Sequence, residues 1–220
     1  NKNIIFSARD RLGVKPFYYK FNNGNFEISS QISPLENNSL TINNIAISAY
    51  LKTGYIPSPL SIYNEINKLS PGCYMIIDLK SNKISIKKYW DLTKTNQVKI
   101  SYDEALNELE KLITDSVKIR LNSDVPMGTF LSGGIDSALI TSIASKISNK
   151  KINTFTIGFE ETHYDESKLA KKYSKILNTN HKKFLCKSSD LVDLIPDLNN
   201  FYDEPFADSS AIPSMFLNKK

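Results

Sequence analysis

The stretch Phe130-Leu131-Ser132-Gly133-Gly134-Ile135-Asp136-Ser137 decides the fold, because it joins a short strand to a helix. Residues 125–131 have the composition of a buried strand. An apolar helical stripe follows, with members four residues apart at Ile135, Leu139, Ile143 and Ile147. The two glycines allow positive φ angles and close backbone approach, and the unpaired N–H groups at a helix start attract an anion. The stretch therefore predicts a phosphate-binding turn between a strand and a helix.

The polar side chains of this turn fit a phosphate that is accompanied by a metal ion. Ser132 and Ser137 add hydroxyl donors. Asp136 is compatible with phosphates when a divalent cation lies between them, as Mg²⁺ does when it accompanies a nucleotide. The alternative is an ordinary turn in which a serine or an aspartate caps the helix. The strand before the turn and the apolar helix behind it favour phosphate binding, although the chain contains no Gly-x-x-x-x-Gly-Lys-Ser/Thr loop.

Two further strands are expected after the turn, at residues 154–159 and 181–186. Between them Asp165-Glu166-Ser167 opens a helix whose apolar positions share one face: Leu169, Ala170, Tyr173, Ile176 and Leu177. This alternation predicts an α/β domain with a doubly wound parallel sheet, whose ligand lies outside the carboxyl ends of the strands. Ser132 and Gly158 both lie at such ends.

Several segments are similar to segments of a known family. The Ser-Gly-Gly-x-Asp-Ser stretch resembles the signature of the ATP pyrophosphatase superfamily. The second half of the chain resembles the synthetase domain of the glutamine-hydrolysing asparagine synthase family, through residues 155–159, Tyr164-Asp165-Glu166, Asn180-His181 and residues 202–213. The first half resembles the end of that family's glutaminase domain, a class II amidotransferase domain, through residues 8–19, and its connecting region through residues 54–59 and 69–72.

The resemblance implies a reaction in which ATP activates aspartate as β-aspartyl-AMP and releases pyrophosphate. Ammonia from glutamine then displaces AMP and gives asparagine. The residues implied to bind ATP and pyrophosphate are Leu131, Ser132, Gly133, Gly134, Asp136, Ser137 and Ile157. Asp136 is also the implied Mg²⁺ ligand. Leu131 and Ile157 would contact the nucleoside, and they are equally suited to a buried strand; the two interpretations are compatible.

Two acidic groups outside the turn are candidate substrate ligands. The resemblance implies that Asp10 binds the amino group of glutamine, although Arg9-Asp10-Arg11 is also compatible with a surface cluster of ion pairs. A second group, which includes Glu204, would line the aspartate and adenylate pocket, and its other members are Asp203, Asp208, Ser209 and Ser210. The alternative for this group is a proline-containing loop that ends in a helix cap.

The chain divides near residue 95. Residues 1–95 are expected to be the C-terminal part of an α+β Ntn-type glutaminase domain with its connector, and residues 96–220 the N-terminal part of the synthetase domain. Strands are expected at residues 4–7, 17–20, 26–29, 73–78 and 84–90, with Asn22-Asn23-Gly24 as a hairpin turn. A helix over 44–53 should end at Gly54. A Ser101–Glu104 capping box should begin a helix that runs to about Leu121, with Leu109, Leu112, Ser116 and Ile119 in register.

Composition excludes some classes of protein. The chain has 28 Lys and Arg against 23 Asp and Glu, but the lysines are scattered without interleaved aromatic residues, which argues against a nucleic-acid partner. Two cysteines are too few for a disulfide framework and fit a reducing cytoplasm. No apolar run reaches membrane-spanning length and no signal peptide opens the chain. The expected partners are therefore ATP, aspartate and glutamine, and the sequence is compatible with a homodimer.

The chain is expected to be a fragment that is catalytically incomplete. Asn1 is not an initiator residue, and the last residues fall inside a helix that begins near Ala211. The family's glutaminase uses an N-terminal cysteine as nucleophile, and neither Cys73 nor Cys186 can take that role, so no catalytic nucleophile is assigned.

Three alternative functions stay open. One is a sister amidotransferase or a β-lactam-forming synthetase that acts on another carboxylate, because the ATP motifs do not specify the acceptor. A tRNA-modifying pyrophosphatase is disfavoured by the shortage of cysteines. A module that binds nucleotide without turnover is disfavoured by the presence of Asp136 and Ser137.

Overall fold

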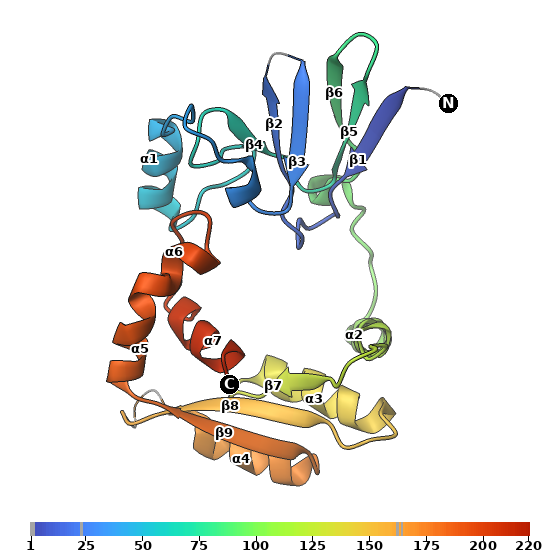
Figure 1. The fold of residues 1–220 in the computed structure, drawn as a ribbon. Helices are drawn as coiled ribbons and strands as arrows, with labels where there is room; N and C mark the ends of the chain where they lie inside the picture. Colours follow the sequence, from blue (N-terminus) through green and yellow to red (C-terminus); the bar gives the residue numbers. More distant parts are fainter. Residues whose placement is uncertain (1–2, 23, 162, 164) are drawn as a thin grey trace. The chain divides into compact units, whose positions relative to one another are not determined.

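The computed structural model describes residues 3–22, 24–161, 163 and 165–220. These form two compact units, and Figure 1 shows their helices and strands. Unit 1 contains residues up to Gln97 together with Asp197–Asp208, and unit 2 contains Val98–Pro196 and Ser209–Lys220. The division at residue 95 that the sequence suggested did not include the return of residues 197–208 to the first unit. The carboxylates of Asp203 and Glu204 account for this return, because both bind backbone N–H groups of unit 1.

Unit 1 contains two small antiparallel sheets. The first has the order β1-β5-β6 and the second the order β3-β2-β4. The strands are β1 (Ile4–Ala8), β2 (Tyr18–Asn22), β3 (Asn25–Ser29), β4 (Ile66–Lys68), β5 (Cys73–Asp78) and β6 (Lys83–Lys88). Both expected hairpins, β2–β3 and β5–β6, are confirmed. Asn23 of the expected turn lies outside the described residues.

Alternation along β5 builds the main core of unit 1. Cys73, Met75 and Ile77 point inward and are buried, while the residues between them are half-buried. Leu69 completes the cluster, and partly buried side chains pack against it: Ile5, Phe17, Tyr19, Phe26 and Ile84. This period of two is the pattern expected of strands with one face on a core.

Helix α1 (Asn44–Thr53) begins and ends where its sequence predicts. The side chain of Asn43 accepts hydrogen bonds from the N–H groups of Ile45 and Ala46 and so caps the first turn. Gly54 ends the helix with φ +80°, in the left-handed region that costs a glycine little. Short 3-10 segments at Ser33–Leu35 and Leu92–Lys94 complete the unit together with α6 (Leu198–Phe201).

Replacing Gly54 with alanine should destabilise unit 1 by about 1 kcal/mol, because an L-residue is strained at this positive φ. The added methyl group would meet the Cβ of Ala207 at 3.5 Å, an ordinary contact, so the cost is conformational. Urea unfolding measures the loss. Ala49→Gly is the comparison variant, because it introduces a glycine inside the same helix and leaves the left-handed position at Gly54 intact. An unchanged urea midpoint for Gly54→Ala would contradict the expectation.

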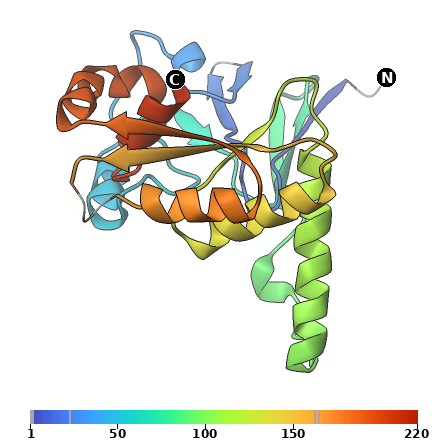
Figure 2. The same cartoon turned by 90° about the horizontal axis from the view of Figure 1, so that it is seen from below.

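Unit 2 is built on a parallel sheet of three strands in the order β7-β8-β9. The strands are β7 (Gly128–Phe130), β8 (Asn153–Phe159) and β9 (Asn180–Cys186). The helices are α2 (Tyr102–Arg120), α3 (Ile135–Ile147), α4 (Ser167–Ile176), α5 (Ser188–Leu194) and α7 (Ala211–Asn218), and a 3-10 turn at Ile195–Asp197 follows α5. Figure 2 shows α3 and α4 on one face of the sheet and α5 and α7 on the other.

The expected α/β class with a parallel sheet is therefore confirmed for unit 2. The strands follow chain order across the sheet. Among the described strands there is no reversal of order, which is the feature that marks a doubly wound sheet.

The burial of the helices corrects part of the sequence analysis. The capping box of α2 is present as expected, with the Ser101 hydroxyl accepting from the Glu104 N–H. However, the expected apolar register of α2 is exposed, with Leu109 at 53 % and Leu112 at 61 %. The face that packs contains Ile113, Val117 and Leu121, which meet Ile143, Ala144 and Ile152. Because α2 is apolar on both faces, only its contact with α3 decides which face is buried. Ile135 of the expected α3 stripe is likewise exposed.

Two further features of the chain are its cysteines and the hydropathy of its helices. Cys73 and Cys186 are both free and buried, and they belong to different units. In the part of the chain that the structure describes, none of the helices combines the length and the apolar character that crossing a membrane requires.

Candidate functional site

The turn between β7 and α3 is held together by its own polar groups. The N–H of Leu131 donates to the carbonyl of Phe155 at 2.9 Å, so β7 stays paired with β8 up to the turn. Beyond it, the Ser137 hydroxyl accepts from the Ser132 N–H at 3.1 Å and lies 2.9 Å from the Ser132 hydroxyl. The Ser132 hydroxyl also accepts from the Gly134 N–H at 3.0 Å. The hydroxyl groups of Ser132 and Ser137 are therefore bonded to each other and to backbone N–H groups of the turn.

The two glycines of the turn serve close approach and not an unusual backbone angle. Neither is among the described residues with positive φ, so the expectation that these glycines adopt positive φ angles was wrong. Gly134 stands at the N-cap position of α3 in an extended conformation, with φ −77° and ψ 154°. A Cβ on Gly133 would come within 3.2 Å of the Glu166 Cβ and 3.3 Å of a Leu169 methyl group. Gly133 is therefore needed because the start of α4 packs directly against the turn.

Glu166 is a residue of the site that sequence reasoning missed. Its Oε2 accepts a hydrogen bond from the Gly133 N–H at 2.9 Å, so a carboxylate occupies the position that the turn offers to an anion. In the sequence, Glu166 marked the start of a helix and belonged to a segment of the family resemblance, but no site role was assigned to it. The available signal was topological: a residue that follows β8 lies at the same edge of a parallel sheet as a turn that follows β7.

A cavity of about 360 Å³ opens beside the turn within unit 2. Its lining includes Leu131, Ser132, Ile157 and Glu166, together with Ser209 and Ser210. Three phenylalanine rings complete the walls: Phe130, Phe155 and Phe159. An apolar cavity with a few converging polar groups is the usual form of a small-molecule site. Ser209 and Ser210 thus line the same cavity as Ser132 of the turn, and Ser210 stands at the N-cap position of α7.

Asp136 fits a magnesium ion of the kind that nucleotides carry. It is the second residue of α3 and exposed, and its carboxylate forms no hydrogen bond or ion pair with any described residue. The described residues contain no group of three or more metal-ligating side chains. Mg²⁺ is usually bound by one or two carboxylates together with substrate phosphates, so a single oxygen donor beside a phosphate turn is a suitable arrangement.

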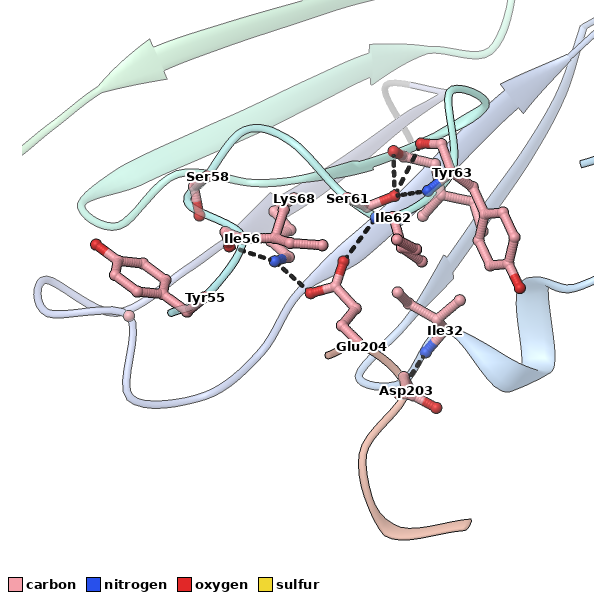
Figure 3. Close-up of polar contacts among 12 residues, drawn as sticks. Ile32, Tyr55, Ile56, Ser58, Ser61, Ile62, Tyr63, Lys68, Asp203 and Glu204 are labelled. Atoms are coloured by element: carbon pink, nitrogen blue, oxygen red, sulfur yellow. Dashed lines mark hydrogen bonds and ion pairs between the residues drawn. The ribbon is translucent and has the colours of Figure 1, made fainter. Parts of the chain in front are cut away.

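Asp203 and Glu204 are placed differently from the sequence expectation. Neither lines the cavity beside the turn; both are bound within unit 1 (Figure 3). The Asp203 carboxylate accepts from the Ile32 N–H at 2.7 Å and the Ser33 N–H at 3.4 Å. Glu204 forms an ion pair with Lys68 and accepts from the Ile62 N–H at 2.8 Å. Asp208 is the last residue of unit 1 in this segment and is not among the residues that line the cavity.

Asp10 organises its own loop. Its Oδ1 accepts from the N–H groups of Leu12 and Val14 and its Oδ2 from the Lys15 N–H, at 2.9 to 3.2 Å. These backbone donors, with Lys15 and Val14 contributing most, hold the pKa of Asp10 below its usual range. The carboxylate pairs with neither neighbouring arginine, since the described ion pairs do not include it. The ion-pair alternative therefore does not describe this loop.

Arg9 holds the same loop through hydrogen bonds of its side chain. Its guanidinium donates to the carbonyls of Gly13 at 3.0 Å, Lys15 at 2.9 Å and Leu69 at 2.7 Å. A cavity of about 580 Å³ lies here within unit 1, lined in part by Arg9, Gly13, Ser58 and Lys68. The loop is thus held by several hydrogen bonds beside a cavity of small-molecule size.

Replacing Glu166 with glutamine should tighten the binding of pyrophosphate by about tenfold, or about 1.4 kcal/mol. The reason is that a pyrophosphate oxygen must displace the carboxylate from the Gly133 N–H, and a neutral amide competes less strongly than an ionised acceptor. Calorimetric titration with pyrophosphate in the presence of Mg²⁺ measures the change. Glu160→Gln removes a charge from the same segment without touching the turn and should leave the affinity unchanged. Weaker binding by Glu166→Gln would show that the carboxylate assists the anion.

The fold and the site define a parallel α/β domain with a serine- and glycine-containing turn beside an apolar cavity, attached to an antiparallel unit with a carboxylate loop. Residues 108–220 match the family model "Asparagine synthase" and residues 1–90 match "Glutamine amidotransferase domain". The chain belongs to the asparagine synthase family.

Two curated relatives are similar over nearly the whole chain. A Methanocaldococcus jannaschii protein, whose name presents it as a candidate asparagine synthetase (glutamine-hydrolyzing) 2, is 39% identical over 97% of this chain and 42% of its own length. Asparagine synthetase (glutamine-hydrolyzing) 1 of Bacillus subtilis is 30% identical over 100% of this chain and 35% of its own length. The chain thus spans less than half the length of the relatives it matches.

Proposed function

We propose that this chain is part of an ATP-dependent amidotransferase that makes asparagine from aspartate, with ammonia derived from glutamine and β-aspartyl-AMP as the intermediate. The observation that carries the proposal is the turn of Ser132, Gly133, Gly134 and Ser137 at the edge of a cavity with aromatic walls. Membership of the asparagine synthase family and the amidotransferase match over residues 1–90 support the same reaction.

In this proposal the turn holds the phosphates of ATP. The N–H groups of Gly133 and Gly134 and the hydroxyl groups of Ser132 and Ser137 donate to the pyrophosphate as its charge develops. Fixed donors that point at developing charge are commonly the largest single contribution to catalysis. Asp136 would hold Mg²⁺, which when bound supplies positive charge that neutralises the phosphates. Leu131, Ile157 and the three phenylalanine rings of the cavity would enclose the nucleoside.

The acceptor carboxylate must reach the α-phosphate of ATP in the same cavity. A free carboxylate resists attack by ammonia because its charge repels nucleophiles and oxide is a poor leaving group. Transfer of AMP to it forms an acyl-phosphate bond and expels pyrophosphate, after which ammonia displaces AMP. Ser209 and Ser210 also line this cavity, and in the proposal their hydroxyl groups orient the acceptor and the adenylate.

The glutamine side of the reaction would use the loop of Asp10. Its Oδ2 accepts only one described hydrogen bond, from Lys15, and a carboxylate oxygen can accept two. The remaining acceptor position suits the ammonium group of glutamine. The nucleophile that releases ammonia is not assigned to any residue of this chain.

The test is pyrophosphate release by the full-length protein with Mg²⁺ and ATP, comparing aspartate with no acceptor and ammonia with glutamine. Release that requires aspartate and yields asparagine is the expected result. ATP binding without stimulation by aspartate would overturn the substrate assignment, and the acceptor would then be another carboxylate, as in a sister amidotransferase or a β-lactam-forming synthetase.

A further inference from the structure

A segment of six residues, Tyr202–Ala207, is fastened to unit 1 by backbone and side-chain bonds, and we call it the anchor segment. The carboxylate of Glu204 binds Lys68 and the Ile62 N–H, and the carboxylate of Asp203 binds the N–H groups of Ile32 and Ser33 (Figure 3). At the end of the segment the Ala207 N–H donates to the Gly54 carbonyl at 2.9 Å.

The ion pair within this anchor is largely withdrawn from water. The side chains of Lys68 and Glu204 are 10 % and 11 % exposed. The Lys68 ammonium also donates to the Ile56 carbonyl at 2.7 Å, so both charges have a second partner. Burial lowers the pKa of Lys68, and the carboxylate of Glu204 opposes that shift. Burial of the Tyr18 phenol raises its pKa, and the negative charge of the Glu204 carboxylate is the second cause of this rise.

Such a pair fixes position more strictly than an apolar contact of the same size would. Apolar side chains tolerate sliding, whereas a charge that is removed from water must keep its partners or pay for desolvation. Glu204 meets an ammonium and a backbone N–H at once, and Asp203 meets two consecutive N–H groups. These bonds define which residue of the segment lies at which point on unit 1.

The anchor lies close in sequence to the cavity of unit 2. Ser209 follows Glu204 by five residues, a length of chain that spans at most about 18 Å. Ser209 and Ser210 line the cavity beside the phosphate turn. A shift of the anchor segment by one residue on unit 1 would therefore change the length of chain that connects it to both serines.

We propose that Lys68 is a positioning residue for the activation of the acceptor carboxylate by ATP. Through its ion pair with Glu204, this side chain of unit 1 fixes the segment that delivers Ser209 and Ser210 to the nucleotide cavity. Lys68 itself is not among the residues that line that cavity. The inference rests on the proposed function, because it assigns Ser209 and Ser210 to the adenylate site.

The experiment is a double-mutant cycle in the full-length protein with Lys68→Met, Glu204→Gln and the double variant. Ammonia replaces glutamine as the nitrogen donor, because Lys68 also lines the cavity beside the Asp10 loop. The expected result is a fall of about tenfold in kcat/KM for acceptor-dependent pyrophosphate release in each single variant, with no further fall in the double variant. Hydrogen exchange in residues 205–212 should accelerate in all three.

Stability is measured alongside, because breaking a buried pair also destabilises a fold while replacing both partners is often neutral. Positioning predicts that the double variant regains its unfolding midpoint but not its kcat/KM. Activity that recovers together with the midpoint would overturn the proposal and leave the pair a purely structural role. Lys88→Met, which breaks an exposed pair with Asp91 in unit 1, is the matched control and should change neither quantity.

The proposed function and the anchor proposal fail in different ways. If the unsubstituted protein shows no acceptor-dependent release of pyrophosphate, the proposed function falls. The anchor proposal is then still tested by the hydrogen-exchange rates of residues 205–212 and by the affinity of the variants for ATP. If the protein releases pyrophosphate and the Lys68 and Glu204 variants match it in rate and in exchange, the anchor proposal falls alone.

Discussion

Replacing Asp136 with asparagine is expected to lower kcat/KM for ATP-dependent pyrophosphate release by about 10² to 10³. The substitution keeps the size of the side chain and the start of α3 but removes the negative charge that Asp136 offers to a metal ion. Asp136 has no hydrogen bond or ion pair with a described residue, so its loss should not loosen the turn. The unfolding midpoint should therefore stay close to that of the unsubstituted protein. Steady-state pyrophosphate release across a series of Mg²⁺ concentrations measures the effect, because a weakened metal site is partly restored by higher Mg²⁺.

Asp103→Asn is the matched control for this prediction. Asp103 is the second residue of α2, as Asp136 is of α3, so both substitutions remove a carboxylate that favours the positive end of a helix. Only Asp136 stands beside the phosphate turn. Equal losses in the two variants would mean that the helix start, and not the metal ligand, is responsible. An Asp136→Asn protein with full activity at low Mg²⁺ would refute the role assigned to this carboxylate.

The sequence predicts the local elements well because their signals are local. The turn at Ser132–Ser137, the parallel strands around it and the Asn43–Gly54 limits of α1 follow from composition, periodicity and caps that lie within a few residues of each other. The buried face of α2 did not follow, since Leu109 and Val117 belong to two apolar faces and only α3 selects between them. Periodicity shows that a face exists, but tertiary contact decides which face is covered.

The candidate site shows the same division between local and distant information. Ser209 and Ser210 line the cavity beside the turn, whereas Asp203 and Glu204 bind groups 171 and 142 residues away in the chain. Nothing near Glu204 in the sequence distinguishes a ligand of substrate from a partner of Lys68. Glu166 was missed for a related reason, because its contact with Gly133 spans 33 residues and arises only when β7 and β8 pair.

Asp10→Asn should raise KM for glutamine by roughly 10- to 100-fold while ammonia-dependent synthesis stays within about twofold of the unsubstituted protein. The carboxylate serves three backbone N–H groups and, in the proposed function, the ammonium of glutamine. An asparagine side chain retains one acceptor oxygen for the loop but carries no charge for the substrate. Its amide nitrogen would also face N–H groups that now have no acceptor. The comparison of the two nitrogen donors measures the effect, since ammonia bypasses the glutamine loop.

Asp78→Asn provides a control with the same local chemistry. Asp78 accepts from the N–H groups of Lys80 and Ser81 at 2.8 and 3.0 Å in the β5–β6 hairpin, and these bonds likewise hold its pKa below the usual range. Its substitution should change the unfolding midpoint slightly and leave KM for glutamine unaltered. If Asp10→Asn lowers the glutamine-dependent and ammonia-dependent rates together, its effect is on folding, and the glutamine-binding role is lost. A selective rise in KM for glutamine would instead locate the effect in the loop that Asp10 organises, because a general loss of folding would lower both rates.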